Sequence, residues 1–343
     1  MLLIVSHGDG EEAASMSQLT NSIRHVLSLA QQPSTWPAYA YQRAWQLAGP
    51  CPPTLAPSPH GGLPELIRWP MRYENSMAAG FVRPLLDGWA DLVPVQHADL
   101  PQVYPRVVVF EAQYGGVPHR VAVDFSDYTD IDQACLSEVA VYFKMQHLLE
   151  GYGERKVVPG GYIAARADLY ANFCRFRRLR SAPSRHDVYG RFGLRFSREK
   201  RLLAVRMLSD RDGLDFVGGT GMVQFTQSLR EAALSKVCID MPGNGPFCHR
   251  LVEYLAVGCC VVAPPHATRL HAELIGGEHI AYCREDLSDL VEVVEHYVRD
   301  DRARRAMSAS AARFFDEHLH RVQLADHYLR VLHERLVTAG HQH

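Results

Sequence analysis

A glycine- and proline-rich loop that leads directly into a short helix is the part of the sequence best suited to bind a charged ligand. The loop, residues 242–246, reads Pro-Gly-Asn-Gly-Pro and follows a β-rich apolar segment at 236–241. Apolar residues at helical spacing predict a helix over 249–257 with Gly258 as its C-cap. Free backbone N–H groups and the helix dipole at such a position favour an anion. Arg250 in the first turn adds positive charge.

Polar groups of the same loop and helix extend this candidate site. Asn244 and Gly245 lie in the loop, and His249 and Glu253 follow on the helix. The loop backbone and the Arg250 side chain are candidates for binding phosphate oxygens, because both present N–H donors. A carboxylate such as Glu253 can bind ligand hydroxyls, or it can simply complement the helix dipole.

Strands and helices alternate through the C-terminal half, which predicts a parallel sheet with helices on both faces. Strands are expected at 187–191, 214–217, 236–241, 261–263 and 279–282. Helices are expected at 197–209 with Ser197 as N-cap, 223–234, 249–257, 268–275, 287–298, 301–316 and 320–338. Ligands bind such sheets outside the carboxyl ends of the strands, where three glycine turns fall. Arg191, Gly218 and Gly219 are therefore further candidate site residues.

The N-terminal half is predicted to form a second α/β unit. We expect strands at 1–6, 107–110, 119–125 and 139–143, a helix at 11–29 and irregular structure with short helices over 31–70. The basic run 175–180 is interpreted as a helix end followed by a linker. The expected units are therefore an N-terminal domain at 1–183, a C-terminal domain at 184–318 and a final helix within 319–343.

Four residues of the N-terminal half are candidates for a catalytic base. His7 and Asp9 lie in a glycine-flanked loop after the first strand, and a histidine can accept a proton near neutral pH. Asp124 and Asp127 end another predicted strand and are alternative carboxylate bases. The Gly8-Asp9-Gly10 segment can equally be a turn that leads into a helix capped by Asp9.

The stretch 249–262, HRLVEYLAVGCCVV, resembles the donor-binding motif of the GT-B glycosyltransferases, R/K-L-x-E-A-L-A-x-G-x-P-V-V. The first-turn arginine is most similar to the exostosin-type variant. The resemblance implies two Rossmann-like domains that face a cleft, with a nucleotide-sugar on the C-terminal domain and an acceptor offered by the N-terminal domain. It also implies that the final helix crosses back onto the first domain; the alternative is that the helices at 301–316 and 320–338 are an amphipathic pair that covers the sheet.

The resemblance also implies roles for individual residues. Glu253 takes the position whose carboxylate binds the ribose hydroxyls of the nucleotide. Many retaining members carry a second glutamate eight positions earlier, where this chain has Gly245. Gly190-Arg191 followed by Lys200 matches the order of the phosphate-binding residues in relatives, and Arg195 and Arg198 compete for the Lys200 role. Some inverting members place a catalytic histidine where His7 lies.

A metal and a cofactor are both expected to be absent from the site. The acidic segment 127–132 lacks the Asp-x-Asp arrangement that metal-dependent transferases use after an apolar strand. GT-B enzymes also generally work without a bound metal. The nucleotide-sugar would then act as a co-substrate alone.

Composition excludes several other functions for the chain. Its 343 residues suffice for two domains, and a net charge of −2 argues against nucleic acid as a partner. The eight cysteines show no CxxC pairs, so we expect no disulfide framework, no zinc site and a reducing, cytoplasmic location. The first strand is too short for a signal peptide, and no apolar run reaches the roughly 18 residues that span a bilayer.

The sequence therefore predicts a glycosyltransferase that moves a sugar from a nucleotide-sugar donor to a glycan or small-molecule acceptor. Two other functions remain open at this point. One is a nucleotide-sugar epimerase or hydrolase on the same fold, and the other is a non-catalytic nucleotide- or glycan-binding module. The sugar, the nucleobase, the acceptor, the stereochemical outcome and the oligomeric state do not follow from the residues.

Overall fold

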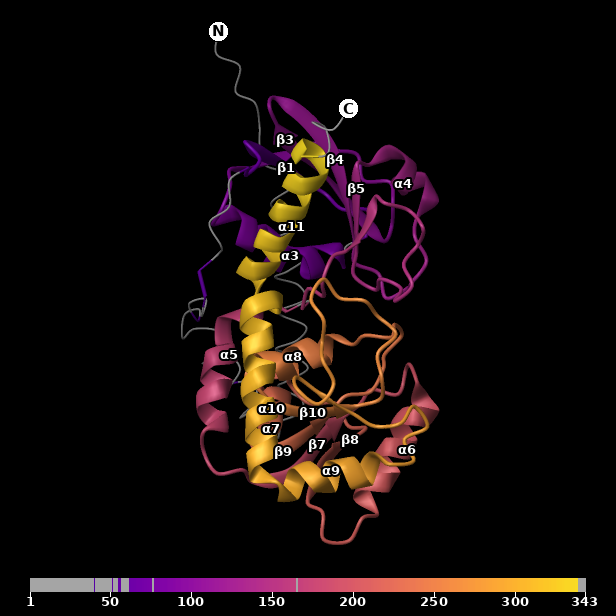
Figure 1. Cartoon of the computed structure of the whole chain (residues 1–343), viewed down its shortest axis with the longest axis vertical. Coiled ribbons are helices and arrows are strands. Elements are labelled where there is room, and N and C mark those ends of the chain that lie inside the picture. The colour runs from indigo at the N-terminus through magenta and orange to yellow at the C-terminus, as the bar shows by residue number, and fades with distance from the viewer. Residues whose placement is uncertain are drawn as a thin grey trace.

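The computed structural model describes residues 62–75, 77–164 and 166–338, together with Ala40, Cys51, Leu55 and Ala56. Two α/β units lie one above the other along the long axis of the molecule (Figure 1). Each unit is built on its own sheet, and both sheets contain parallel strands. The predicted fold class, α/β with two Rossmann-like units, is thus confirmed.

The first unit contains a six-stranded mixed sheet in the order β2-β1-β3-β4-β5-β6. Its strands are β1 (Leu66–Pro70), β2 (Val95–Ala98), β3 (Val107–Tyr114), β4 (Val117–Asp124), β5 (Val141–Lys144) and β6 (Val157–Pro159). β3 and β4 form an antiparallel hairpin, whereas β4, β5 and β6 run parallel. The strands predicted at 107–110, 119–125 and 139–143 are therefore present as β3, β4 and β5.

The second unit contains a five-stranded sheet in the order β11-β10-β9-β7-β8, with every pair parallel. Its strands are β7 (His186–Arg191), β8 (Phe216–Gly219), β9 (Ser235–Ile239), β10 (Cys260–Ala263) and β11 (Ala281–Tyr282). β10 is buried at all four positions, as expected for a strand covered by helices on both faces. The alternation of strands and helices in the sequence thus correctly predicted a parallel sheet here.

Helices cover both sheets and connect them. They are α3 (Ala78–Ala90), α4 (Gln133–Glu138), α5 (Ala167–Arg180), α6 (Arg198–Ser209), α7 (Phe225–Ala233), α8 (His249–Val257), α9 (Leu290–Arg299), α10 (Asp301–Phe314) and α11 (Arg321–His333). Two π-helical segments, η2 (Phe315–Leu319) and η3 (Glu334–Thr338), extend α10 and α11. α8 ends as predicted at Gly258, whose φ of 77° is left-handed and favours glycine.

The final helix, α11, lies against the first unit although it follows the second in sequence (Figure 1). The Tyr328 ring stacks on Phe143 of β5 with centroids 3.9 Å apart. Trp89 of α3 donates its indole N–H to the Ala325 carbonyl oxygen at 3.2 Å. Gly88 of α3 faces the Arg321 carbonyl so closely that a Cβ there would lie 2.6 Å from the oxygen.

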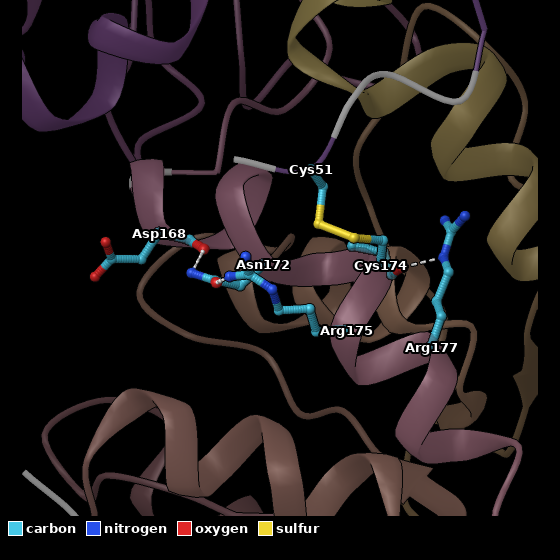
Figure 2. The surroundings of a disulfide bond; sticks show 7 residues. Cys51, Asp168, Asn172, Cys174, Arg175 and Arg177 are labelled. Atoms are coloured by element: carbon cyan, nitrogen blue, oxygen red, sulfur yellow. Dashed lines mark hydrogen bonds between the residues drawn. A yellow bond between two sulfur atoms is a disulfide. The ribbon is translucent and has the colours of Figure 1, made fainter. Parts of the chain in front are cut away.

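A disulfide joins Cys51 to Cys174 of α5, with the two Cα atoms 6.1 Å apart (Figure 2). The expectation of no disulfide is therefore wrong. No local pattern predicts this bond, because its two cysteines are 123 residues apart and only the fold brings them together. Disulfides persist in oxidising environments, so this bond argues against a reducing compartment. The cytoplasmic location stays a prediction.

Three local predictions are also wrong. The helix expected at 268–275 is absent, and there the Arg269 N–H donates to the His147 carbonyl of the first unit. Ser197 occupies the N-cap position of α6, but its side chain makes no capping hydrogen bond: its φ is 47° and its hydroxyl donates to the Gly243 carbonyl at 2.9 Å. The segment expected to be irregular contains β1 at its end.

No helix in the described part of the chain is long and apolar enough to cross a membrane. The strand expected at 1–6 and the helix expected at 11–29 lie outside the described residues.

Candidate functional site

A cavity of about 320 Å³ lies at the carboxyl ends of the strands of the second sheet, where the glycine-rich loop meets residues of the first unit. We call it the strand-end cavity. It is lined by Asp127, Arg166, Arg191, Gly193, Arg195, Phe196, Arg201, Met222, Val223, Phe225, Ser228, Gly243, Asn244, Gly245, Phe247, Cys248, His249, Arg250 and Glu253.

The cavity brings together eight of the fifteen candidate residues predicted from the sequence. These are Asp127, Arg191, Arg195, Asn244, Gly245, His249, Arg250 and Glu253. Arg198, the other competitor for the Lys200 role, does not line the cavity. Lys200 is not among the lining residues and forms an ion pair with Glu285 instead. Gly218 and Gly219 end β8 and do not line the cavity either. His7 and Asp9 lie outside the described residues, so their roles stay predictions.

Glu253 of α8 is a buried carboxylate, with 6% of the residue exposed. Burial raises its pKa, and the positive charges of His249, Arg166 and Arg250 oppose this shift. His249 Nε2 lies 4.0 Å from a Glu253 carboxylate oxygen, and no residue in the described part of the chain forms a hydrogen bond with this carboxylate. Glu253 is therefore free to accept hydrogen bonds from a ligand.

Arg250 is fixed at the edge of the sheet by three contacts. Its guanidinium lies 2.9 Å from the buried Asp240 carboxylate at the end of β9, and it also donates to the Met241 carbonyl. The Phe192 ring lies under the guanidinium at 5.1 Å. These contacts hold the positive charge in place before any ligand binds, so little side-chain entropy is lost on binding.

Arg191, the last residue of β7, presents a second arginine to the cavity. Its guanidinium pairs with Glu231 at 2.8 Å and donates to the Gly221 carbonyl at 2.9 Å. Its Nε is buried and has no hydrogen-bond partner.

Two arginines of the cavity were not predicted. Arg201 of α6 is buried and donates to the Gly193 and Pro242 carbonyls, which fixes both loops. The sequence feature that could have identified Arg201 is its spacing from Ala204 and Leu208, three and seven residues later, which places it on the buried face of α6. Arg166, just before α5, lies 4.5 Å above the Phe225 ring, and nothing in its local sequence distinguished it.

Asp127 is the described candidate base that reaches the cavity. It follows β4 of the first unit, so the cavity contains residues from both units. Burial raises its pKa, whereas His249 and a hydrogen bond with Gln146 lower it. The net upward shift means that Asp127 takes a proton more readily than an exposed aspartate does.

Asp124 does not reach the cavity. Its carboxylate is buried in the first unit, where it accepts hydrogen bonds from Ser126 and Tyr142 and lies 2.8 Å from Lys144 Nζ. The Lys144 side chain is fully buried, so the two charges satisfy each other. These contacts indicate a structural role for Asp124.

Gln146 links the two units beside the cavity. Its side-chain amide donates to the Phe247 carbonyl at 2.8 Å and accepts from the Phe247 N–H at 3.2 Å. Its oxygen also accepts from the Thr268 hydroxyl at 3.1 Å. Because Gln146 is fully buried and also contacts Asp127, it holds the candidate base and the glycine-rich loop in one arrangement.

The cavity combines excess positive charge with carboxylates. Arg166, Arg191, Arg195, Arg201 and Arg250 outnumber Asp127 and Glu253. Such a site can bind an anion through guanidinium and backbone N–H groups and can bind hydroxyls through Glu253. No group of histidines, cysteines and carboxylates in the described residues could hold a metal ion.

Comparisons with known proteins agree with this chemistry in the second unit. Residues 182–330 match the family model described as "Glycosyl transferase-like". This range includes the motif at 249–262, so the resemblance to glycosyltransferases is confirmed over the C-terminal part of the chain.

Among solved structures, a glycosyltransferase from Rickettsia africae ESF-5 is similar to this chain. The sequence identity is 11%, the TM-score is 0.38, and the alignment covers 57% of this chain and 62% of that one. The chain therefore spans less than two thirds of that protein. No curated protein matches the chain.

Proposed function

We propose that the protein is a glycosyltransferase that uses a nucleotide-sugar bound in the strand-end cavity. The observation that carries this proposal is the buried Glu253 carboxylate, which accepts no hydrogen bond from the described residues, beside the arginines and the glycine-rich loop. The arginines and loop N–H groups would bind the diphosphate, and Glu253 would accept hydrogen bonds from the ribose hydroxyls. The family match over residues 182–330 supports glycosyl transfer in general.

The proposed reaction is a single displacement at the anomeric carbon of the sugar. An acceptor hydroxyl oxygen forms a bond to that carbon while the bond to the diphosphate oxygen breaks. The nucleoside diphosphate leaves with the electron pair, and Arg191 and Arg250 stabilise its charge. The acceptor proton passes to Asp127, whose raised pKa suits a base. The proposal uses arginines rather than a metal for the phosphate charge.

Glu253→Gln tests the proposal directly. A charged hydrogen bond contributes about 1.5–3 kcal/mol, so nucleotide-sugar affinity should fall about tenfold to a hundredfold. Isothermal titration calorimetry with UDP, GDP, ADP, dTDP and CDP sugars measures this change. The fold should survive, because the substitution removes a buried carboxylate that has no hydrogen bond.

Glu292→Gln is the matched control, since Glu292 lies in the first turn of α9 and does not line the cavity. If wild type and Glu253→Gln bind the same nucleotide-sugar with equal affinity, Glu253 does not contribute to donor binding and its assigned role is wrong. Absence of binding for every nucleotide-sugar would overturn the proposed function.

A further inference from the structure

Cys248 is a free cysteine that lines the strand-end cavity at the start of α8. It occupies the N-cap position of this nine-residue helix, and its side chain makes no capping hydrogen bond. The positive end of the helix dipole at this position favours the thiolate form of a cysteine. The residue is 5% exposed, and the cavity gives small molecules a route to its sulfur.

Three side chains that carry or can carry positive charge surround the Cys248 sulfur. His249 Nδ1 lies 3.9 Å from it, and Arg250 is two residues further along the chain. Arg201 is also near, because a Cβ placed on Gly243 would lie 3.7 Å from Arg201 Nη2 and 3.8 Å from the sulfur. Burial raises the pKa of the Cys248 thiol, but Arg250 and His249 lower it by more. The thiolate, which is the nucleophilic form, is therefore favoured here.

The other five free cysteines lie in the described part of the chain, and their surroundings differ from those of Cys248. None of them lines the strand-end cavity. Burial raises the pKa of Cys135, Cys260 and Cys283 to about 12. Cys238 and Cys259 form a hydrogen bond with each other and have no exposed surface. Cys248 thus combines thiolate character with access in a way that these cysteines do not.

A second observation shows that a ligand of the strand-end cavity would lie beside this sulfur. Glu253, five residues after Cys248 on the same short helix, is 6% exposed and accepts no hydrogen bond from the described residues. A ligand that reaches both Glu253 and the glycine-rich loop at 242–246 passes the start of α8, where Cys248 lies. Any group added to the sulfur would therefore occupy space that the ligand needs.

We propose that Cys248 is a peroxide-reactive thiol and that its oxidation to a sulfenic acid prevents a ligand from binding in the strand-end cavity. The thiolate sulfur attacks one oxygen of the peroxide, so that an S–O bond forms while the O–O bond breaks. The sulfur is oxidised and the peroxide is reduced. The hydroxide that leaves takes up the proton that the thiol released, which gives water. The effect on a nucleotide-sugar rests on the proposed function, whereas the oxidation itself does not.

Hydrogen peroxide followed by dimedone, a reagent that labels sulfenic acids, tests the assignment on the folded full chain. Peptide mass spectrometry measures the label on each cysteine. Cys248 should carry about tenfold more label than any other free cysteine, because reactivity follows thiolate character and access. His249→Gln should lower the label on Cys248, since it removes the ring beside the sulfur. His296→Gln is the matched control, because His296 is exposed on α9 and does not line the cavity.

Competition with a nucleotide-sugar tests the blocking effect. At ten times its Kd, a nucleotide-sugar that binds should lower the labelling of Cys248 about tenfold, because only the empty cavity reacts. Peroxide treatment should in turn weaken nucleotide-sugar binding by the wild type. The difference between treated and untreated protein should disappear in Cys248→Ser and persist in Cys283→Ser, since Cys283 lies outside the cavity.

Three results would overturn the proposal. Two are the absence of label from Cys248 and an equal distribution of label over the six free cysteines. The third is undiminished labelling of Cys248 while a nucleotide-sugar is bound, which would show that oxidation and ligand do not compete. Failure of the proposed function is separate, because it is read from the absence of nucleotide-sugar binding to untreated protein, whereas dimedone labelling without nucleotide reports on the thiol.

Discussion

Of the two candidate bases that the structure describes, Asp127 lines the strand-end cavity and is partly buried, whereas Asp124 does not reach the cavity. Asp127→Asn should lower turnover about 10²–10⁴-fold, the range that a general base contributes, with donor affinity unchanged. The base must be ionised, so wild-type turnover should fall as pH drops through the Asp127 pKa. Burial raises that pKa, so this loss should begin at a higher pH than for an exposed aspartate. Turnover of a donor with its acceptor, measured from pH 4 to 9, gives the profile.

Asp130→Asn is the control, because Asp130 is exposed and paired with Arg106 at 2.7 Å. His7→Ala is the competing variant. A loss of this size in His7→Ala, together with wild-type turnover in Asp127→Asn, would assign the base to His7.

Residue types and spacing were sufficient to predict the residues that follow strand ends and helix starts. Arg191, Arg250 and Glu253 were found because their chain positions determine which edge of a parallel sheet they occupy. Arg166, which lines the cavity, and Gln146, which lies beside it, were not found, because their positions depend on how distant segments of the chain pack together. Lys200 was expected beside the phosphates, but Glu285 forms its ion pair.

The glycine-rich loop is the element on which the junction of the two units depends. A Cβ at Gly245 would lie 2.5 Å from the Asp127 backbone oxygen and 2.6 Å from Gln146 Nε2. Gly245→Ala should therefore destabilise the protein by about 1–3 kcal/mol, the usual cost of overpacking. Gly243 is the control, because the nearest atoms to its Cβ position are 3.7 and 3.8 Å away. Gly243→Ala should change stability by at most about 0.5 kcal/mol.

Urea denaturation followed by circular dichroism measures both glycine variants. Equal stabilities for Gly245→Ala and Gly243→Ala would show that the Asp127 backbone can move away without cost. The same contact explains why the second glutamate of the GT-B motif has no place at this position, since any side chain at Gly245 meets the first unit.

Elements were predictable where sequence periodicity alone determines them. The strands and helices of 186–263 follow from apolar spacing and glycine turns, and the structure contains them. The helix expected at 268–275 is absent. In this segment the Arg269 N–H instead donates a hydrogen bond to the His147 carbonyl of the first unit. A contact between segments so far apart in the chain cannot be predicted from a local sequence pattern. Ser197 failed as a cap for a similar reason, since its hydroxyl bonds to a loop distant in sequence.

At the scale of the whole molecule, α11 joins the end of the described chain to the first unit. The Tyr328 hydroxyl is buried there without a partner. Tyr328→Phe should therefore leave stability unchanged or raise it, because a buried, unsatisfied polar group is removed. Tyr328→Ala should cost about 3–5 kcal/mol, because it removes the ring that packs on Phe143. Thermal and urea unfolding compare the two variants, and a destabilised Tyr328→Phe would reveal an unseen hydrogen bond.

The disulfide between Cys51 and Cys174 also constrains the whole molecule, because it links α5 covalently to a residue 123 positions away in the sequence (Figure 2). Denaturation without reductant followed by iodoacetamide should modify the six free cysteines and leave this pair unmodified. Reduction should lower the free energy of unfolding by about 2–4 kcal/mol. The double variant Cys51→Ser/Cys174→Ser should be insensitive to reductant, and modification of all eight cysteines without reductant would contradict the bond.

The return of α11 has a consequence for the order in which the protein matures during synthesis. Domains generally fold as they leave the ribosome, with the N-terminal domain first. Here the apolar faces of Trp89 and Phe143 are covered by residues 321–333, which are translated after both sheets. Part of the core of the first unit therefore stays exposed to solvent until the second unit and α11 have been synthesised. The first unit begins synthesis before the second but can complete its core only after it.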